Sequence, residues 1–423
     1  MAKKNSKKTV PDLRFRGFTD PWEQRQLGES FNMLRNNTLS RADLSNDRKG
    51  VLDIHYGDVL IRYRAVVDVS TLQGPSINIT NNRFLGDRLT DGDIIMADTA
   101  EDTSAGKCVE IEGIMHQNVV AGLHTIPLRP ATPSSHGYWG QYLNSASFRN
   151  QLFPKMQGTK VISLSRTTVS NATVRYPSLA EQRRIGEFFS TLDSLIAAAE
   201  RQETLLRRKK QAYLQLMFPR EGETQPRLRF AGFSGGWERR QLREVAEKTG
   251  SGGTPTSSNP RYYGGSIPFL GISDINGRYV DTTQKTLTEE GLANSAAWIV
   301  PQGTISLAMY ASYGKSAILA RAMATSQAFF NIVFRSNVTR DFVFSRLQCA
   351  ESRHEWDALV STGTQPNLSG SKLKKWTIGY PSLPEQHHIG EFFKVLDSLI
   401  AAAEERTKAL TALKSVYLQR MFA

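Results

Sequence analysis

The sequence predicts an α+β protein: two mixed α/β globular domains joined by a pair of long antiparallel coiled-coil helices, with an internal pseudo-two-fold repeat. Residues 176–218 recur at 380–422 with a constant offset of 204, and 27 of the 43 aligned positions are identical. A shorter repeat pairs 11–27 with 226–242. The segments between these repeats are largely unlike each other. Repeated segments that flank two unlike inserts are typical of a protein that presents two different surfaces in the same structural setting.

Length and composition narrow the class of protein. A chain of 423 residues is long enough for two or three domains. Its net charge of +13 favours a polyanionic partner, nucleic acid ahead of an anionic membrane, although a basic protein that is merely soluble stays an alternative. The two cysteines exclude a disulfide framework. With no signal-peptide core and no apolar run long enough for a membrane span, we expect a cytoplasmic protein.

The repeats divide the chain into four parts. We expect an N-terminal arm and first globular domain at 1–175, and a first long helix with its linker at 176–225. A second globular domain at 226–379 and a second long helix at 380–423 complete the chain.

Both long repeats have the sequence pattern of a coiled-coil helix. Each opens with Ser-x-x-Glu, Ser178 with Glu181 and Ser382 with Glu385, which is the spacing of a capping box. Apolar residues then recur every 3.5 positions, and a lysine in each seam is expected to fix register. The alternative is that each helix packs only on its neighbouring domain. The residues expected to pair the helices are Ile185, Phe189, Leu192, Ile196, Leu206, Lys210, Ile389, Phe393, Leu396, Ile400, Leu410 and Lys414.

Short strands and helices are expected in each insert. Strand patterns occur at 57–69 and 92–100 in the first insert, and at 266–275, 297–310 and 328–334 in the second. Short helices are expected at 139–153 and 341–360.

A Gly-Thr turn near the end of each insert is the main candidate for contact with nucleic acid. The two turns lie at a similar distance before each capping box and carry side chains that hydrogen-bond to bases or phosphates. Loops at 251–265 and 309–318 add tyrosines and cations. The candidate DNA-binding residues are Gly158, Thr159, Lys160, Arg62, Tyr63, Lys107, Thr254, Arg261, Tyr262, Tyr310, Tyr313, Lys315, Gly363, Thr364, Gln365 and Asn367.

No motif for catalysis, metal binding or cofactor binding is found. The Gly-Lys-Ser at 314–316 is not a P-loop, because the first glycine of that motif would fall at Met309. We therefore expect a protein that is not itself an enzyme and that holds no metal or cofactor.

These residues together resemble a known family, the specificity subunits of type I restriction-modification systems. The Pro-Ser-Leu-x-Glu-Gln-x-x-Ile openings at 177–185 and 381–389 are similar to the conserved regions of that family. Segments 251–276, 294–318 and 363–376 resemble one type of target-recognition domain, and 92–111 with 122–130 resembles another.

The resemblance implies a division of labour. Each target-recognition domain would read one half of an asymmetric, bipartite site on double-stranded DNA, and the helices would set the spacer. Two methyltransferase subunits would dock on the chain, with motor-nuclease subunits joining for cleavage, and AdoMet, ATP and magnesium would belong to those partners. Two other hypotheses stay open: a coiled-coil adaptor whose variable domains bind proteins, and a self-sufficient nuclease or methyltransferase.

Overall fold

The computed structural model describes residues 10–45, 50–72, 74–77, 86–360 and 367–423, which form two compact units. Unit 1 consists of Met1–Ala198 and Thr407–Ala423, and unit 2 of Ala199–Arg406. Both long helices, α6 (Leu179–Met217) and α11 (Leu383–Met421), contribute one part to each unit. The second globular unit is thus continuous in sequence, whereas the first is completed by the C-terminal segment.

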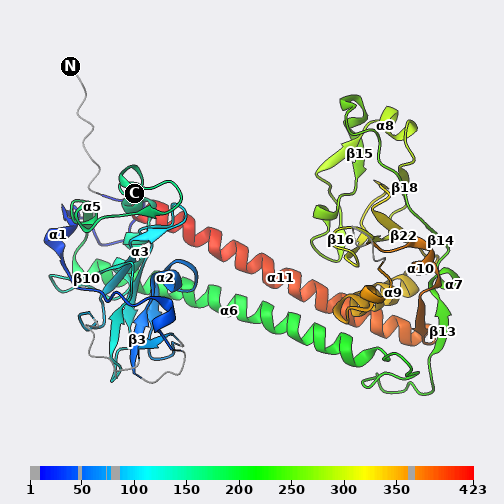
Figure 1. Cartoon of the computed structure of the whole chain (residues 1–423), viewed down its shortest axis with the longest axis horizontal. Helices are drawn as coiled ribbons and strands as arrows, with labels where there is room; N and C mark the ends of the chain where they lie inside the picture. Colours follow the sequence, from blue (N-terminus) through cyan, green and yellow to red (C-terminus); the bar gives the residue numbers. More distant parts are fainter. Residues whose placement is uncertain (1–9, 46–49, 73, 78–85, 361–366) are drawn as a thin grey trace. The chain divides into compact units, whose positions relative to one another are not determined.

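Unit 1 is built on a five-stranded sheet, whose strand β10 is labelled in Figure 1. Its strand order is β2-β10-β6-β8-β4, antiparallel except for the parallel pair β8–β4. A smaller sheet has the order β5-β3-β9. The strands are β2 (Phe31–Met33), β3 (Val51–Ile54), β4 (Val66–Asp68), β5 (Ser76–Ile77), β6 (Ile94–Ala97), β8 (Cys108–Glu112), β9 (Val119–Ala121) and β10 (Thr125–Pro130).

Unit 2 repeats this topology although its sequence is different. Its five-stranded sheet has the order β14-β22-β19-β20-β16, again antiparallel except for the last pair. Its smaller sheet, β17-β15-β21-β18, has one strand more. The strands are β14 (Lys248–Gly250), β15 (Tyr263–Phe269), β16 (Tyr279–Val280), β17 (Lys285–Leu287), β18 (Trp298–Val300), β19 (Ile305–Ala308), β20 (Ser316–Leu319), β21 (Met323–Thr325) and β22 (Phe329–Val333).

Short elements connect the sheets to the long helices in both units. Strands β1 (Glu23–Gln26) and β12 (Thr173–Tyr176) pair in unit 1, as β13 (Glu238–Gln241) and β23 (Thr377–Tyr380) pair in unit 2. Strands β7 (Thr99–Ala100) and β11 (Ile162–Ser163) pair in unit 1. The short helices are α1 (Leu27–Ser30), α2 (Tyr56–Ile61), α3 (Tyr138–Asn144), α4 (Ala146–Arg149), α5 (Arg166–Ser170), α7 (Leu242–Val245), α8 (Glu289–Ala293), α9 (Asn337–Ser352) and α10 (Gly370–Lys375).

The predicted strand at 57–69 is wrong over its first half. Residues Tyr56–Ile61 form helix α2, and only Val66–Asp68 are extended. The side chain of His55 accepts a hydrogen bond from the amide of Gly57 and so caps the helix, a role that favours a helix start over a strand.

The two long helices are antiparallel. In unit 1, Phe189 near the start of α6 stacks on Phe422 just after α11, and in unit 2 Phe218 just after α6 stacks on Phe393 near the start of α11. The seam lysines make equivalent ion pairs, Lys414 with Asp193 at 2.7 Å and Lys210 with Asp397. Among the seam residues predicted to pair the helices, Ile185, Phe189, Leu192, Ile196, Ile389, Phe393, Leu396 and Ile400 are buried, and Leu206 and Leu410 are half-buried.

A buried ion pair anchors the start of each long helix. Glu181 and Glu385 are each only 1% exposed and accept two hydrogen bonds, from Arg14 (2.6 and 2.7 Å) and from Arg229 (2.7 and 2.8 Å) respectively. The sequence predicts these glutamates as members of a capping box. Their carboxylates instead tie each helix to the shorter repeat, which begins at residue 11 or 226.

Candidate nucleic-acid interface

Three loops of unit 1 meet where strand β6 ends. The residue after the strand, Asp98, donates its amide to the carbonyl of His124 (3.0 Å), and its carbonyl accepts from the amide of Leu164 (2.8 Å). The loop 98–107, the turn 122–124 and the loop 157–163 are therefore held at one end of the sheet. We call these three segments the loop end of unit 1.

Unit 2 builds the same end with different residues. The amide of Met309, which follows β19, donates to the carbonyl of Ala328 (2.8 Å), and its carbonyl accepts from Leu368 (2.9 Å). The loop end of unit 2 thus consists of 309–315, 326–328 and the described residues 367 and 368. Because the backbone contacts correspond one to one, positions in the two units can be compared directly.

The first Gly-Thr turn projects from the loop end of unit 1. Gln157 and Ser163 close the loop with two backbone hydrogen bonds of 3.1 and 2.8 Å, and Gly158, Thr159 and Lys160 within it are exposed. Gly158 has φ of +110°, and a Cβ there would clash with the carbonyl of Val161. In unit 2 a bridge between Val360 and Leu368 closes the corresponding loop. The predicted residues Gly363, Thr364 and Gln365 lie outside the described residues, whereas Asn367 is described and partly exposed.

Two of the three remaining candidates in unit 1 are engaged by the protein itself. Arg62 is exposed and forms an ion pair with Asp58 at 3.1 Å. Lys107 is half-buried and donates to the carbonyl of Leu60 at 2.6 Å; its burial lowers its pKa. Tyr63 is 6% exposed within a hydrophobic cluster, and burial raises its pKa. A side chain packed in the core cannot reach a base, so the prediction of a DNA contact at Tyr63 is not retained.

The candidates of unit 2 fall into two groups. Thr254 donates to the side chain of Gln327 at 2.7 Å, beside Tyr310 at the loop end. By contrast, Arg261 and Tyr262 pack beside α8, in the part of unit 2 where Figure 1 draws β15. The sequence grouped these loops together, but the fold separates them.

Tyr313 and Lys315 belong to the segment 309–315 of the loop end of unit 2. Both are partly buried, and the Tyr313 hydroxyl donates to Asp357 at 3.0 Å, which raises the pKa of the tyrosine.

Sequence reasoning missed a cluster at the loop end of unit 1. The ring of Tyr56 meets that of His124 edge to face at 5.3 Å, and Thr99 donates to Asp98 at 2.7 Å. His124 lies 3.6 Å from Asp98 and is about half exposed. These side chains combine aromatic faces with hydrogen-bond donors and acceptors, as direct readout of base edges requires. His124 stands alone in the sequence, and only the backbone pairing with Asp98 reveals its position.

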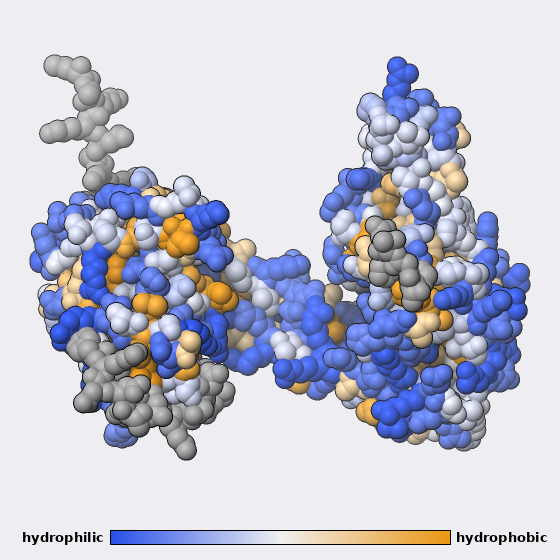
Figure 2. Space-filling view, in the orientation of Figure 1, coloured by the Kyte–Doolittle hydropathy of each residue, from blue (hydrophilic) through white to orange (hydrophobic). Residues whose placement is uncertain are grey.

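Two kinds of feature are absent from the described residues. Among the described residues, no group of three or more histidine, cysteine, aspartate or glutamate side chains could hold a metal ion. No helix in the part of the chain that the structure describes is long and apolar enough to cross a membrane. The visible surface of each unit is mostly hydrophilic, with scattered apolar residues (Figure 2).

Comparisons with known proteins agree on one family. Residues 234–412 match the model of the type I restriction modification DNA specificity domain. The chain is 28% identical over 177 residues to the type I restriction enzyme MjaIX specificity subunit of Methanocaldococcus jannaschii, a match that covers 41% of each chain. It is 22% identical over 401 residues to the putative MjaX specificity subunit of the same organism, covering 90% of this chain and 88% of the relative. The E. coli EcoR124I/EcoR124II specificity subunit is 24% identical over 54% of each chain.

Solved structures show the same fold. The crystal structure of the S subunit of a type I restriction-modification system from M. genitalium superposes with a TM-score of 0.63 at 14% identity, covering 98% of this chain and 99% of that one. A chain from a study of complex assembly and conformational transition of the type I R-M system gives 0.57 at 18% identity, covering 95% and 97%.

Residues 234–412 are thus similar to type I restriction modification DNA specificity domains, and the strand order of this part of the chain recurs in unit 1. The chain is similar in sequence to specificity subunits of type I restriction-modification systems, and it shares the fold of the solved S subunit.

Proposed function

We propose that the chain is the DNA-reading subunit of a type I restriction-modification complex and has no catalytic site of its own. Each unit reads one half of an asymmetric, bipartite site through its loop end. Methyltransferase subunits and motor-nuclease subunits dock on the chain and supply catalysis, with AdoMet, ATP and magnesium as their cofactors.

The observation that carries this proposal is the pair of equivalent loop ends with unlike side chains. Two units with one strand order present His124 and Tyr56 in the first and Gln327 and Thr254 in the second. Unlike donors and acceptors on equivalent loop ends suit the reading of two different base sequences. The net charge of +13 supplies sequence-independent attraction to phosphates.

The long helices suit a role in setting the spacer between the half-sites. Each has 39 residues, which corresponds to about 58 Å at 1.5 Å per residue. One turn of B-DNA separates half-sites by roughly 34–36 Å. Removing matched heptads from both helices should change the tolerated spacer, and an unchanged spacer would contradict this role.

Alanine replacements at the two loop ends test the central claim. Thr159→Ala with Lys160→Ala should change the bases preferred in one half-site, and Thr254→Ala with Asn367→Ala those in the other. The measurement is sequencing of modified DNA from cells that contain the variant chain and its partner subunits. Equal weakening at all sequences would instead assign these residues to the phosphate backbone.

The claim that catalysis belongs to the partners has its own test. The purified chain incubated with AdoMet and DNA should transfer no methyl groups, whereas the complex with methyltransferase subunits should. Appreciable turnover by the chain alone would contradict the proposal.

A further inference from the structure

Each loop end contains a short turn whose backbone is held by polar side chains of the same unit. In unit 1 this is the turn 122–124, which carries His124, and in unit 2 it is the turn 326–328, which carries Gln327. Both of these side chains are exposed, whereas Gly122 and Ser326, which begin the turns, are buried. The direction in which His124 and Gln327 point therefore depends on the contacts at the buried start of each turn.

In unit 1 these contacts come from three polar side chains. Asn37 donates to the carbonyl of Ala121 at 3.0 Å and to Asp53 Oδ2 at 2.6 Å. Asn36 donates to the carbonyl of Gly122 at 3.3 Å. The second carboxylate oxygen of Asp53 packs against Gly122, where a Cβ would lie only 2.4 Å from it. Asn37 is 1% exposed and Asp53 is 0% exposed, so neither can contact a ligand itself.

A further side chain joins this group to another segment of the loop end. Arg166 lies in helix α5, which follows the loop 157–163. It donates to Asn36 Oδ1 at 2.9 Å and to the carbonyl of Leu34 at 2.7 Å. Asn36 thus links the turn 122–124 to the helix after the Gly-Thr turn, and holds the two segments in one arrangement.

Unit 2 holds its turn through different residues. Asn331 on β22 donates to the hydroxyl of Thr325 at 2.8 Å, and the hydroxyl of Ser306 on β19 donates to Asn331 Oδ1 at 2.8 Å. All three side chains are 0% exposed, and Thr325 directly precedes the turn 326–328. At the register positions of Thr325 and Asn331, unit 1 has Ala121 and Pro127, which cannot form these hydrogen bonds. Each unit therefore has its own way of fixing the turn.

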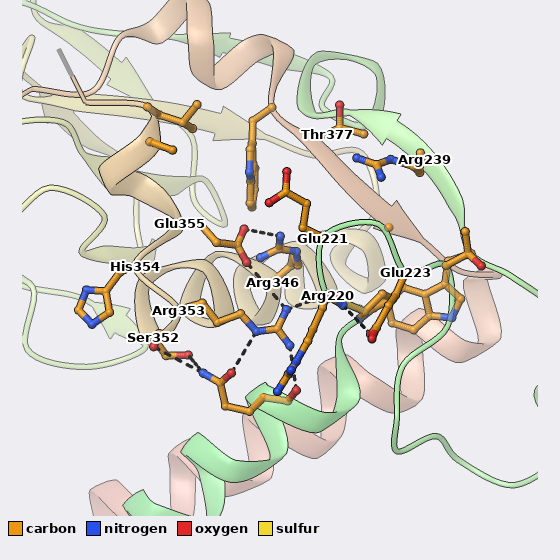
Figure 3. Close-up of a pocket in the computed structure, with 18 residues that line it drawn as sticks. Arg220, Glu221, Glu223, Arg239, Arg346, Ser352, Arg353, His354, Glu355 and Thr377 are labelled. Atoms are coloured by element: carbon orange, nitrogen blue, oxygen red, sulfur yellow. Dashed lines mark hydrogen bonds and ion pairs between the residues drawn. The ribbon is translucent and has the colours of Figure 1, made fainter.

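Other polar contacts of unit 2 connect helices instead of loops. Arg346 of α9 donates to Glu355 at 2.6 Å. Arg353, at the end of α9, donates to the carbonyls of Phe218 and Pro219 at 2.8 and 2.9 Å and so contacts the end of α6 (Figure 3). These contacts stabilise unit 2 and provide a comparison for the group that holds the turn.

We propose that two groups of polar side chains position the turns for reading DNA and so determine specificity without themselves contacting bases. The groups are Asn36, Asn37 and Asp53 in unit 1, and Ser306, Thr325 and Asn331 in unit 2. This inference rests on the proposed function, in which His124 and Gln327 contact base edges. Such a contact requires a donor or acceptor at hydrogen-bond distance and in the right direction. An exposed side chain meets this requirement when the backbone that carries it is fixed by the residues around it.

Variants that remove or keep one hydrogen bond test the proposal. Asp53→Ala removes the acceptor of Asn37, whereas Asp53→Asn keeps one. Thr325→Val replaces the hydroxyl with a methyl group, whereas Thr325→Ser keeps the hydroxyl. The measurement is binding of the assembled complex, the full chain with methyltransferase subunits, to duplexes in which one half-site at a time is altered.

The expected losses are confined to one half-site each. Asp53→Ala should reduce discrimination about tenfold in one half-site and Thr325→Val about tenfold in the other, while Asp53→Asn and Thr325→Ser stay within about twofold. Asn36→Ala removes a half-buried side chain, and should show the same one-sided loss as Asp53→Ala even if that variant does not fold.

Two controls lower stability without changing either group. Val51→Ala removes buried apolar atoms on the strand that carries Asp53, and Arg353→Ala removes the contacts of α9 with the end of α6. Both should lower the midpoint of urea unfolding and leave discrimination in both half-sites unchanged.

Three results would overturn the proposal. They are unchanged discrimination in Asn36→Ala and Thr325→Val, an equal loss in the controls or the conservative variants, and a loss shared by both half-sites. A natural complex without preference in either half-site would instead contradict the proposed function, so the two failures can be told apart.

Discussion

Unit 1 and unit 2 attach their sheets to the long helices through corresponding contacts. The buried pair of Arg14 with Glu181 corresponds to that of Arg229 with Glu385. The ring of Trp22 lies 6.3 Å from Phe422 in unit 1, and that of Trp237 lies 6.1 Å from Phe218 in unit 2. In both units the repeated sequence therefore supplies the residues that fix the globular part to its helices.

The loop ends of the two units differ in most side chains but not in backbone pairing. Their exposed side chains carry little of the packing, so they can change while the sheet below is kept. Equivalent substitutions in the contacts that the two units share should therefore lower stability by similar amounts. A substitution at a loop end should affect only what that unit binds.

The largest effect is expected at the anchoring glutamates. Glu181→Ala and Glu385→Ala each leave a mostly buried arginine without its partner, and each should lower the free energy of unfolding by about 3–5 kcal/mol. Urea unfolding followed by tryptophan fluorescence measures both. Glu23→Ala, which removes an exposed pair with Arg25, is the control and should cost less than about 1 kcal/mol. If only one of the two glutamate variants lost stability, the two buried ion pairs would not be equivalent.

A pH effect is expected at a buried carboxylate of unit 1. Asp53 on β3 is fully buried, and desolvation raises its pKa from 3.8 to about 6. The folded state then binds more protons than the unfolded state between about pH 4 and 6, so stability falls as pH rises through this window. Unit 2 has Phe269 at the corresponding register position, paired with Ala324 as Asp53 is with Val120.

Asp53→Asn should remove this dependence. Relative to the variant, the natural chain should lose up to about 3 kcal/mol of stability between pH 4 and 6. Thermal unfolding across that range is the measurement. Parallel stability curves for the two proteins would show that Asp53 does not titrate as its burial implies.

Asp397 and Asp193, which each pair with a lysine of the other long helix, should differ in how much they stabilise the protein. Asp397 accepts from Lys210 and from Arg278, which is 3% exposed and also pairs with Asp341. Asp193 accepts from Lys414 and lies 3.6 Å from the more exposed Arg64. Asp397→Ala should therefore cost about 2–3 kcal/mol and Asp193→Ala about 1 kcal/mol. If both variants lost the same free energy of unfolding in urea, the buried Arg278 would not make the Asp397 pair more stabilising than the Asp193 pair.

The long helices could be predicted from the sequence because their signals are local. The gapless repeat and the 3.5-residue period predict both helices, and Lys210 and Lys414 were expected in the seam. Their partners Asp397 and Asp193 could not be named, since the pairs depend on which residues face each other across antiparallel helices.

The candidate nucleic-acid interface was less predictable, because it is assembled from segments that lie far apart in the sequence. Tyr63 follows an apolar stretch that suggests an exposed strand, yet helix α2 turns it into the core. His124 joins Asp98 and Leu164 only through backbone hydrogen bonds between three loops. The sequence also did not show that the two unlike inserts share one strand order. Many different side chains can build the same sheet topology, as long as buried and exposed residues alternate along each strand.

The turns that precede β10 and β22 should affect base discrimination. His124 lies in the turn 122–124 of unit 1 and Gln327 in the equivalent turn 326–328 of unit 2, and both side chains can hydrogen-bond to base edges. His124→Ala should reduce discrimination in one half-site by about tenfold, and Gln327→Ala in the other, since one base contact contributes roughly 1–3 kcal/mol. The measurement is binding of the assembled complex to duplexes in which one half-site at a time is altered. Asn276→Ala, on an exposed turn of unit 2 away from these loops, is the control and should change neither preference. If both variants lost affinity for every duplex to the same extent, the loop ends would hold the phosphate backbone, and the difference between the units would have to lie elsewhere.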